Sequence, residues 1–510
     1  MDIFQAEQAA LESLGLARSS AVVVKGRLDR FPPLVVDYVL SDASDDLAKQ
    51  TKAMYTRGWT VGREILAMPR KDFGSRPAVL AEPAARVLYH ALVASLDSHL
   101  PEPTRTGENW QNYESFGCDA DTDYVAQIDI ASCYEYIEHS QLERELIVRS
   151  SNVSASQALV RLLKSMVGRD CGIPQMHWAS DRLADAYLDI IVRQLAREGL
   201  NVIRYVDDIR IHARTWHEGN DVIDRAAEYA RELGLTLNSE KTRVFRSDKL
   251  RAVRDEKSLV LRRYFNDAKQ TTFRVIIRTL RGPYGDVEEL EEVVEQLQDV
   301  AQAALWKMLH DWHRAYVTHG SESKEAAELA QAVSLGVTGL STYAERLPDN
   351  LLRDMAFSHP TQLEQVCLYI IDRARVDDLD ETFRTLGGMI SNVRRGAWAS
   401  LWLLHTLSQM PVPPDTESGQ TIATWVREQL LDRHETVRAQ AVWVTAQYGL
   451  LDTSSLSLAY REASQLTQPA IAAAIGRQKN VPDRLIRAVR DESILNKKAY
   501  EWGVSQIPAS

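Results

Sequence analysis

The first half of the chain alternates strand-like runs with one long helical pattern. Residues 124–130 (YVAQIDI) form an apolar run of strand length, and residues 202–206 and 209–211 form two more around a turn. Between them, the apolar positions of residues 180–200 recur at helical spacing, which predicts a helix with one buried face. The order strand, helix, hairpin predicts an α+β domain.

The second half has a different pattern. From Val287 onward the apolar positions follow helical spacing, and strand-like runs become rare. Two similar segments, residues 392–399 (NVRRGAWA) and 436–443 (TVRAQAVW), are separated by about the period of HEAT-type helical pairs. We therefore expect an α+β domain over residues 1–285 and an all-α domain over residues 286–510. The second domain is either a HEAT-like repeat or a plain helical bundle.

Composition adds limits to this picture. The 510 residues carry a net charge of −11, and 45% of them are hydrophobic, as in ordinary globular proteins. We find no apolar run of transmembrane length, no signal peptide and no paired cysteine motif. We therefore expect a cytoplasmic protein with reduced thiols and no membrane partner. Charge is uneven: residues 241–281 are basic and suited to phosphate contacts, and the acidic residues 286–295 mark the expected boundary.

Two places in the first half carry acidic residues suited to metal chemistry. Asp207 and Asp208 lie at the tip of the predicted hairpin, and Asp129 lies at the end of the predicted strand of residues 124–130. Phosphoryl transfer from a nucleoside triphosphate uses two divalent cations, and carboxylates supply the hard oxygen ligands that such cations prefer. Alone, an Asp-Asp pair is equally expected in an ordinary turn, so the hairpin by itself leaves both interpretations open.

Five segments occur in the order of the sequence motifs of reverse transcriptases. They are similar to the fingers segment and to motifs A, B, C and D of that family. In chain order they are Arg76–Leu92, Asp129–Tyr134, Gly172–Gln175 followed by Ser180, Tyr205–Asp208, and Gly234–Thr242. The chain therefore resembles a reverse transcriptase, which implies a fingers–palm core in the α+β half.

The resemblance implies which residues bind the catalytic metals. By position, the ligands of two Mg²⁺ ions, with Mn²⁺ as an alternative, would be the carboxylates of Asp129, Asp207 and Asp208 and the backbone carbonyl of Ile130. Lys241 would lie near the pyrophosphate as a general acid. The implied activity is that of a nucleotidyltransferase that makes DNA from dNTPs.

The resemblance also implies a nucleotide pocket. Tyr134 would lie under the sugar and exclude a 2′-hydroxyl, and Gln175 would line the pocket. Arg76, with Lys71, would hold the triphosphate oxygens. One position departs from the motif, because Met176 follows Gln175 where the family has Gly. A Met side chain there would crowd the place of a templating base, which puts templated copying in doubt.

A polymerase core followed by a long helical half resembles bacterial abortive-infection (Abi) reverse transcriptases, related to AbiK and AbiA, and most closely the type carried by P-two-like prophages. This resemblance implies an anti-phage role, homo-oligomers, and template-independent synthesis primed by a protein tyrosine. The single-stranded DNA product would then be covalently attached, with Tyr38 and Tyr55 as candidate primers. The alternatives are a templated RNA-directed DNA polymerase and a non-catalytic helical scaffold with a polymerase-like core.

Overall fold

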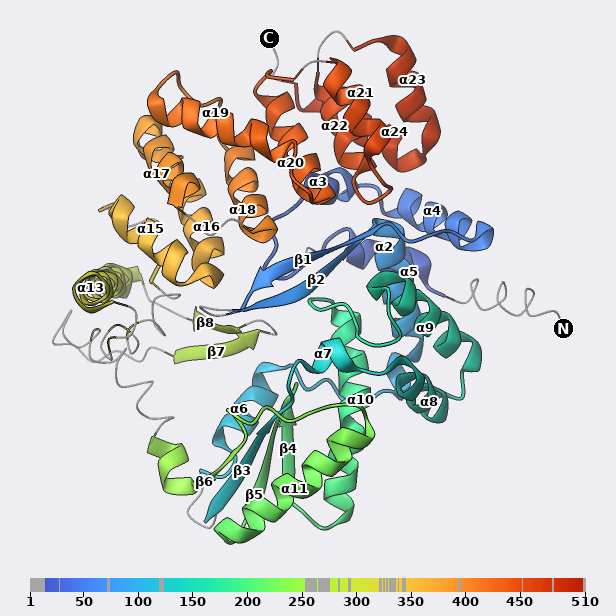
Figure 1. Ribbon diagram of the computed structural model, residues 1–510, viewed down its shortest axis with the longest axis vertical. Coiled ribbons are helices and arrows are strands. Elements are labelled where there is room, and N and C mark those ends of the chain that lie inside the picture. Colours follow the sequence, from blue (N-terminus) through green and yellow to red (C-terminus); the bar gives the residue numbers. More distant parts are fainter. Residues whose placement is uncertain are drawn as a thin grey trace. The chain divides into compact units, whose positions relative to one another are not determined.

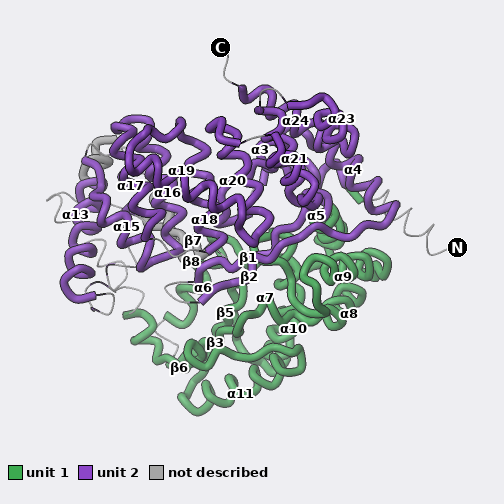
Figure 2. Tube along the Cα trace, turned by 45° about the horizontal axis from the view of Figure 1, so that its top comes forward, with its two compact units in different colours: residues 1–15, 88–263, 278–287 green, residues 16–87, 264–277, 288–510 purple. Residues whose placement is uncertain are grey.

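The computed structural model divides into two compact units, each built from segments distant in the sequence (Figure 2). Unit 1 comprises residues 1–15, 88–263 and 278–287, and unit 2 comprises residues 16–87, 264–277 and 288–510. The structure describes residues 14–507 except 27, 71–73, 119–122, 253–263, 265–275, 283–284, 292–294, 321–322, 324–325, 327–328, 330–335, 338, 342–344, 393–395, 452 and 479–480, and except the side chains of residues 276–300. The single boundary at residue 285 remains a prediction about the order of domains along the chain.

Unit 1 contains helices packed around an antiparallel sheet. Its elements are α5 (Pro83–Leu96, from Leu88 onward), η1 (Asp97–His99), α6 (Gly107–Ser115), β3 (Tyr124–Asp129), α7 (Cys133–Tyr136), α8 (His139–Ser150), α9 (Val153–Val167), α10 (Trp178–Arg197), β4 (Val202–Tyr205), β5 (Asp208–Ala213), α11 (Trp216–Glu232) and β6 (Arg243–Arg246). The strand order is β4-β5-β3-β6, and α10 and α11 pack on the sheet (Figure 1). The predicted strand, helix and hairpin are all confirmed.

The two central strands bring acidic residues to one end of the sheet. Ile128 on β3 and Ile211 on β5 are fully buried, because both strands are covered on both faces. β3 pairs with β5 in an antiparallel register that places Asp129 opposite Asp208. β4 pairs with β5 so that Tyr205 is also opposite Asp208. The end of β3 therefore lies beside the tip of the β4–β5 hairpin.

Unit 2 combines an N-terminal part with a long array of helices. Its elements are α2 (Leu16–Val23), α3 (Val35–Leu40), α4 (Ser44–Arg57), β1 (Arg63–Pro69), β2 (Ser75–Ala81), α13 (Glu295–His319), α15 (Asp349–Ser358), η2 (Pro360–Gln362), α16 (Leu363–Arg373), α17 (Leu379–Asn392), α18 (Ala397–Ser408), α19 (Glu417–Gln429), α20 (Glu435–Gln447), α21 (Thr453–Glu462), α22 (Gln468–Arg477), α23 (Asp483–Glu492) and α24 (Ile494–Ser505). Helices α16, α18, α20, α22 and α24 contact one another in succession, as do α15, α17 and α19. Such alternating layers are typical of stacked helical pairs (Figure 1). The first of the two similar sequence segments ends in the first turn of α18 and the second lies within α20, and these two helices are neighbours in one layer.

The N-terminal part of unit 2 is tied to these helices by polar contacts. The Glu64 carboxylate of β1 accepts from the backbone N–H groups of Glu435 and Thr436 at 2.8 and 3.0 Å, and so caps α20. The indoles of Trp398 and Trp402 on α18 both donate to the carbonyl of residue 30. The β1–β2 hairpin, which is antiparallel, also packs against α18. Residues 16–87 and the helical array therefore share one folded unit.

One prediction about secondary structure is wrong. The spacing of apolar residues from Val287 predicted a helix, but the structure has a two-stranded sheet of β7 (Ile276–Gly282) and β8 (Gly285–Glu291) there. Over so short a span the apolar positions fit both periods, and a glycine at each side of the turn favours a hairpin. Helices follow from Glu295.

The structure also bears on the cysteines and on membrane-spanning helices. The four cysteines are free thiols, as predicted, and three of them are buried. Among the described helices, none combines the length and the apolar character that crossing a membrane would require.

Candidate active site

The β4–β5 hairpin has a strained turn at its tip. Val206 has a φ of 55°, in the left-handed region that β-branched residues rarely adopt. The guanidinium of Arg204 donates to the carbonyl of Val206 at 2.7 Å, and the Val206 N–H donates to Thr104 Oγ1 at 3.2 Å. Strain of this kind costs about 1–3 kcal/mol and persists only where the surroundings enforce it. These contacts therefore set the position of Asp207, the next residue.

Three aspartates occupy neighbouring backbone positions at this end of the sheet. Asp129 and Asp208 are register partners, and Asp207 lies in the turn that leads into Asp208. The N–H of Ile130 donates to the carbonyl of Asp207 at 3.4 Å, which joins the turn to the end of β3. Asp129 and Asp208 are 3% and 7% exposed, whereas Asp207 is less buried. Asp207 is therefore the carboxylate most open to a ligand.

Both oxygens of the Asp129 carboxylate already accept from nitrogen donors. Lys241 Nζ lies 2.8 Å from Oδ1, and Asn238 Nδ2 donates to Oδ2 at 2.9 Å. The same loop is fixed to the strand by its backbone, because the Asn238 N–H donates to the Asp129 carbonyl at 2.8 Å. Lys241 pairs with Asp129 in this structure, and its role near the pyrophosphate remains a prediction. Asn238 lies within the segment Gly234–Thr242 that resembles motif D, but it was not predicted as a site residue.

The donor chemistry of the three carboxylates fits Mg²⁺, which prefers hard oxygen ligands. As the side chains stand, no three His, Cys, Asp or Glu residues in the described part of the chain converge into a metal cage. At Asp129 the physical reason is plain, since both oxygens face Asn238 and Lys241. A metal ion at this carboxylate would have to compete with those two donors.

Cys133 lies close to the carboxylates, at the start of α7. Burial raises the pKa of its thiol, and the negative charges of Asp207 and Asp129 raise that pKa further. The thiol is 2% exposed. It therefore stays protonated and packs as a small apolar group, and it is not a nucleophile at this site.

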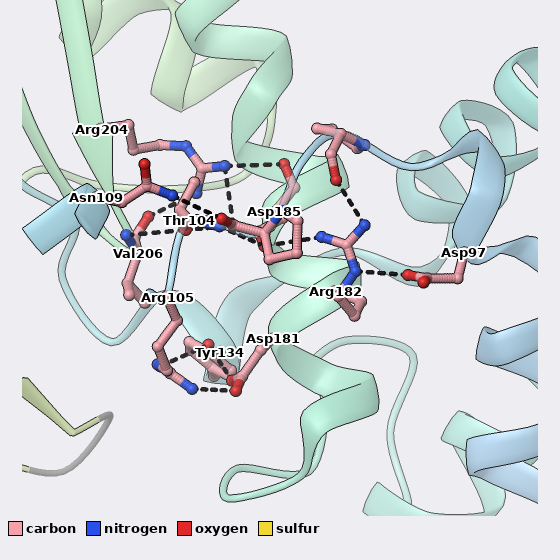
Figure 3. A network of polar contacts seen from close by, with 12 residues as sticks. Asp97, Thr104, Arg105, Asn109, Tyr134, Asp181, Arg182, Asp185, Arg204 and Val206 are labelled. Atoms are coloured by element: carbon pink, nitrogen blue, oxygen red, sulfur yellow. Dashed lines mark hydrogen bonds and ion pairs between the residues drawn. The ribbon is translucent and has the colours of Figure 1, made fainter. Parts of the chain in front are cut away.

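Tyr134 projects from α7 into a polar cluster of its own. Its hydroxyl donates to Asp181 Oδ1 at 2.8 Å and accepts from Arg105 Nη2 at 3.3 Å. Arg105 and Asp181 also form an ion pair with each other (Figure 3). The ring packs against a buried aromatic cluster that includes Trp110 and Tyr205. The ring and the hydroxyl of Tyr134 are thus both held.

A second polar cluster supports the hairpin turn from behind. Asp185 on α10 accepts from Arg204 Nη2 at 3.0 Å and from Thr104 Oγ1 at 2.5 Å, and it pairs with Arg182 at 3.2 Å (Figure 3). Arg182, Asp185 and Arg204 are all less than 10% exposed. These residues were not predicted as site residues from the sequence. Their one visible signal was the presence of charges at 182 and 185 within a helix predicted from its apolar face.

The segment predicted as motif B has unusual backbone geometry. Met176 has a φ of 71° and is 6% exposed, and the preceding Gln175 is 7% exposed. A left-handed backbone favours glycine, so the position where the family has Gly keeps a glycine-like conformation with a buried Met side chain. Ser180, at the start of α10, hydrogen-bonds to Tyr89 at 2.7 Å and donates to the carbonyl of Pro174. The loop is thereby fixed to the helix.

The residues predicted to hold the triphosphate lie outside the sheet that carries the three aspartates. Arg76 lies on β2 of unit 2, opposite Met68 of β1. Lys71 lies outside the described residues, and so does most of the basic segment from residue 253 onward. Their roles remain predictions.

One family model and several solved structures are similar to this chain. Residues 69–276 match the family model of reverse transcriptase (RNA-dependent DNA polymerase). Among solved structures, the telomerase of Candida albicans in complex with a TWJ fragment of telomeric RNA is similar at 11% identity and a TM-score of 0.29, over 76% of this chain and 65% of that one. The corresponding telomerase of Candida tropicalis is similar at 9% identity and a TM-score of 0.26, over 75% of this chain and 67% of that one.

The chain thus spans about two thirds of the length of each telomerase. A comparison with curated proteins found no significant match. The family match and the motif order both fall on the same part of the sequence. Residues 69–276 therefore contain a reverse transcriptase domain, which is a domain of the nucleotidyltransferase class.

Proposed function

We propose that the protein is a metal-dependent DNA polymerase whose metal ligands are Asp129, Asp207 and Asp208, joined by the carbonyl of Ile130. The observation that carries the proposal is the strand register. It places Asp129 opposite Asp208 at the hairpin whose turn holds Asp207, inside the segment that matches the reverse transcriptase family. When bound, two divalent cations supply charge neutralisation at the phosphates and activation of the attacking hydroxyl.

The chain's own residues position the reactants. The backbone contacts of Val206 hold Asp207 at the tip of the hairpin, and Asn238 fixes the orientation of the Asp129 carboxylate. Lys241 keeps a positive charge within reach of this site, where it can donate a proton to the leaving pyrophosphate once it is released from Asp129. This role requires the Lys241 side chain to move, which its partly exposed position allows.

The nucleotide would be bound by the residues that the motif resemblance assigns to it. We assign Tyr134 to the exclusion of a 2′-hydroxyl, Gln175 to the pocket wall, and Arg76 with Lys71 to the triphosphate. The support for Tyr134 is its fixed ring beside the aromatic cluster of Tyr205, the residue that begins the acidic motif. Substrates would accordingly be dNTPs.

We further propose that synthesis is template-independent and primed by a tyrosine, as part of an anti-phage defence in the cytoplasm. Met176 supports the absence of a template, because its buried side chain occupies a position where the family has Gly. Tyr38 is 36% exposed and stacks on Trp502, so its hydroxyl end is a candidate primer, as is Tyr55. The alternating helical layers of unit 2 would act as a HEAT-like scaffold for homo-oligomers.

The decisive experiment is dNTP incorporation with Mg²⁺ by the full chain and by Asp207→Asn. We expect the variant to lose at least about a hundredfold in incorporation rate, because one metal ligand loses its charge. Asp224→Asn, an exposed aspartate on α11, is the matched control and should be unaffected. Equal incorporation by wild type and Asp207→Asn would contradict the polymerase and favour the scaffold alternative.

A templated RNA-directed DNA polymerase is the second candidate, favoured by the family match itself. Product sequencing separates the two, because templated DNA must match an RNA. DNA that stays attached to denatured protein supports tyrosine priming, and its loss in Tyr38→Phe or Tyr55→Phe would identify the primer. If Met176 excludes the template, Met176→Gly should gain template-matched product. If wild-type product already matches an RNA, template independence is wrong.

A further inference from the structure

Two adjacent residues contact two different parts of the candidate site. Thr104 accepts from the N–H of Val206 in the metal-bearing turn and donates to Asp185. Arg105, the next residue, contacts the Tyr134 hydroxyl and pairs with Asp181 (Figure 3). One short segment of chain therefore links the turn of Asp207 to the side chain of Tyr134.

The acidic partners of this segment come from one rigid element. Asp181 and Asp185 are four residues apart on α10, so they project from the same face on consecutive turns. Asp181 lies in the first turn of the helix, where the N-terminal end of the helix dipole favours a negative charge. A helix of 20 residues with a buried face is a firm anchor for both contacts.

The selectivity of Tyr134 for the sugar depends on how firmly its ring is held. An aromatic ring can exclude a 2′-hydroxyl by steric contact, but a ring that rotates away avoids the clash. The free energy of discrimination against the ribonucleotide therefore cannot exceed the free energy needed to move the ring aside. The aromatic cluster restrains one face of the Tyr134 ring, and the hydrogen bonds of its hydroxyl restrain rotation about the side-chain bonds. Removing the second restraint should therefore lower selectivity without removing the ring.

We propose that Asp181 and Arg105 are positioning residues for sugar selection, which hold the Tyr134 ring where it excludes a ribonucleotide. Neither residue needs to touch the nucleotide for this role. The inference rests on the proposed polymerase function and on the role given there to Tyr134. It predicts that discrimination between dNTP and rNTP depends on a contact behind the ring, on the side of α10.

The test measures kcat/KM for a dNTP and for the matching rNTP with the full chain. In Asp181→Ala, the preference for the dNTP should fall by about tenfold, the effect of losing one charge-assisted hydrogen bond. Tyr134→Phe keeps the ring and loses the hydroxyl, so its preference for the dNTP should fall by a similar factor. Because both variants break the same contact, the double variant should lose no more than either single variant.

The control is Asp189→Ala, on the same helix. Asp189 pairs with Arg149 and Arg193, so the variant also removes an aspartate–arginine contact, but it should keep the dNTP preference unchanged. Thermal unfolding of each variant reports folding separately. Should Asp181→Ala fail to fold, Asp181→Asn keeps the size and one acceptor oxygen, and it should show a smaller loss of preference in the same direction.

The outcomes distinguish the inference from the function beneath it. Absence of incorporation by wild type contradicts the polymerase, and an unchanged preference in Tyr134→Ala contradicts the role of Tyr134. If the wild type incorporates dNTPs and Tyr134→Ala lowers the dNTP preference, then an unchanged preference in Asp181→Ala overturns only the inference about Asp181 and Arg105. Additive losses in the double variant would overturn it too, because Asp181 would then act by a route other than the Tyr134 hydroxyl.

Discussion

The two compact units bury their charged side chains differently. In unit 1, Asp185 contacts both Arg182 and Arg204, so that three buried charges share partners. In unit 2, the buried Arg373 pairs with Asp377 one turn along the chain, and Asp377 also lies 3.6 Å from Arg346. The side chains of Arg346 and Asp377 are 13% and 11% exposed, so this cluster is less buried than the one in unit 1. The described core of the unit 2 helices is otherwise assembled mainly from apolar layers around large residues such as Trp402 and Leu404.

This difference concerns geometry more than stability. A buried ion pair contributes little net stability compared with apolar packing, because removing two charges from water costs about as much as their attraction returns. Its value lies in fixing geometry, since a carboxylate between two guanidinium groups has few acceptable positions. Unit 1 has such a cluster, with all three side chains buried, behind the turn of Asp207, whereas the shared cluster of unit 2 is partly exposed and the described core around it is mainly apolar.

The largest effect is expected when the cluster shared by Arg182, Asp185 and Arg204 is broken. Asp185→Ala should lower the free energy of unfolding by about 3–5 kcal/mol, because Arg182 and Arg204 remain buried without their common partner. Incorporation should fall as well, since Arg204 also holds the Val206 carbonyl. Asp189→Ala, one turn further along α10 and 22% exposed at its side chain, should cost only about 1 kcal/mol in denaturant unfolding. Equal losses would remove the distinction between the two kinds of ion pair.

The matching experiment in unit 2 removes a helix cap. Glu64→Ala should lower the free energy of unfolding by about 1–2 kcal/mol, because two N–H groups at the start of α20 lose their acceptor. The dNTP preference should not change, since no contact of Glu64 belongs to the Tyr134 cluster. Glu64→Gln, which keeps one acceptor oxygen, should lie between. A changed nucleotide preference would show that the helical unit does more than support the fold.

A smaller effect concerns metal affinity. In Lys241→Ala, Mn²⁺ should bind about three- to tenfold more tightly in calorimetric titration, because the metal no longer competes with the ammonium group at Asp129. Lys241→Arg should resemble wild type, and Lys249→Ala, an exposed lysine of the same unit, should show no change. Weaker binding in Lys241→Ala would mean that the ion pair does not oppose the metal.

The smallest effect is a pH dependence of unit 1. Burial lowers the pKa of His139 below 6.5, and its Nε2 lies 2.7 Å from the carbonyl of Gly172 in the motif B loop. As the pH falls below 6.5, the unfolded chain takes up a proton that the folded chain resists, so the free energy of unfolding decreases until the lowered pKa is passed. His139→Gln should reduce this decrease between pH 7.5 and 5.5. An identical slope in both proteins would assign the dependence to other groups.

Local patterns predicted much of unit 1. The strand that ends at Asp129 and the hairpin with Asp207 at its tip followed from short apolar runs around turn residues, because a buried central strand leaves that signature in any context. The helix of residues 180–200 followed from its apolar face. The spacing of apolar residues led to a wrong prediction near Val287. A span of a few residues there fits both a helix and a strand, and pairing with β7 favours the strand.

The acidic motif, the order of the five segments and the departure at Met176 are properties of residue type and spacing, so they can be predicted without a structure. The contacts that hold these residues in place are visible only in the folded chain. Thr104, Arg105 and Asp181 lie far from Tyr134 and Val206 along the chain, and no local pattern marks them as partners. Hydrogen bonds depend on distance and angle in space, so the cluster that fixes the turn and the Tyr134 ring exists only after the chain has folded.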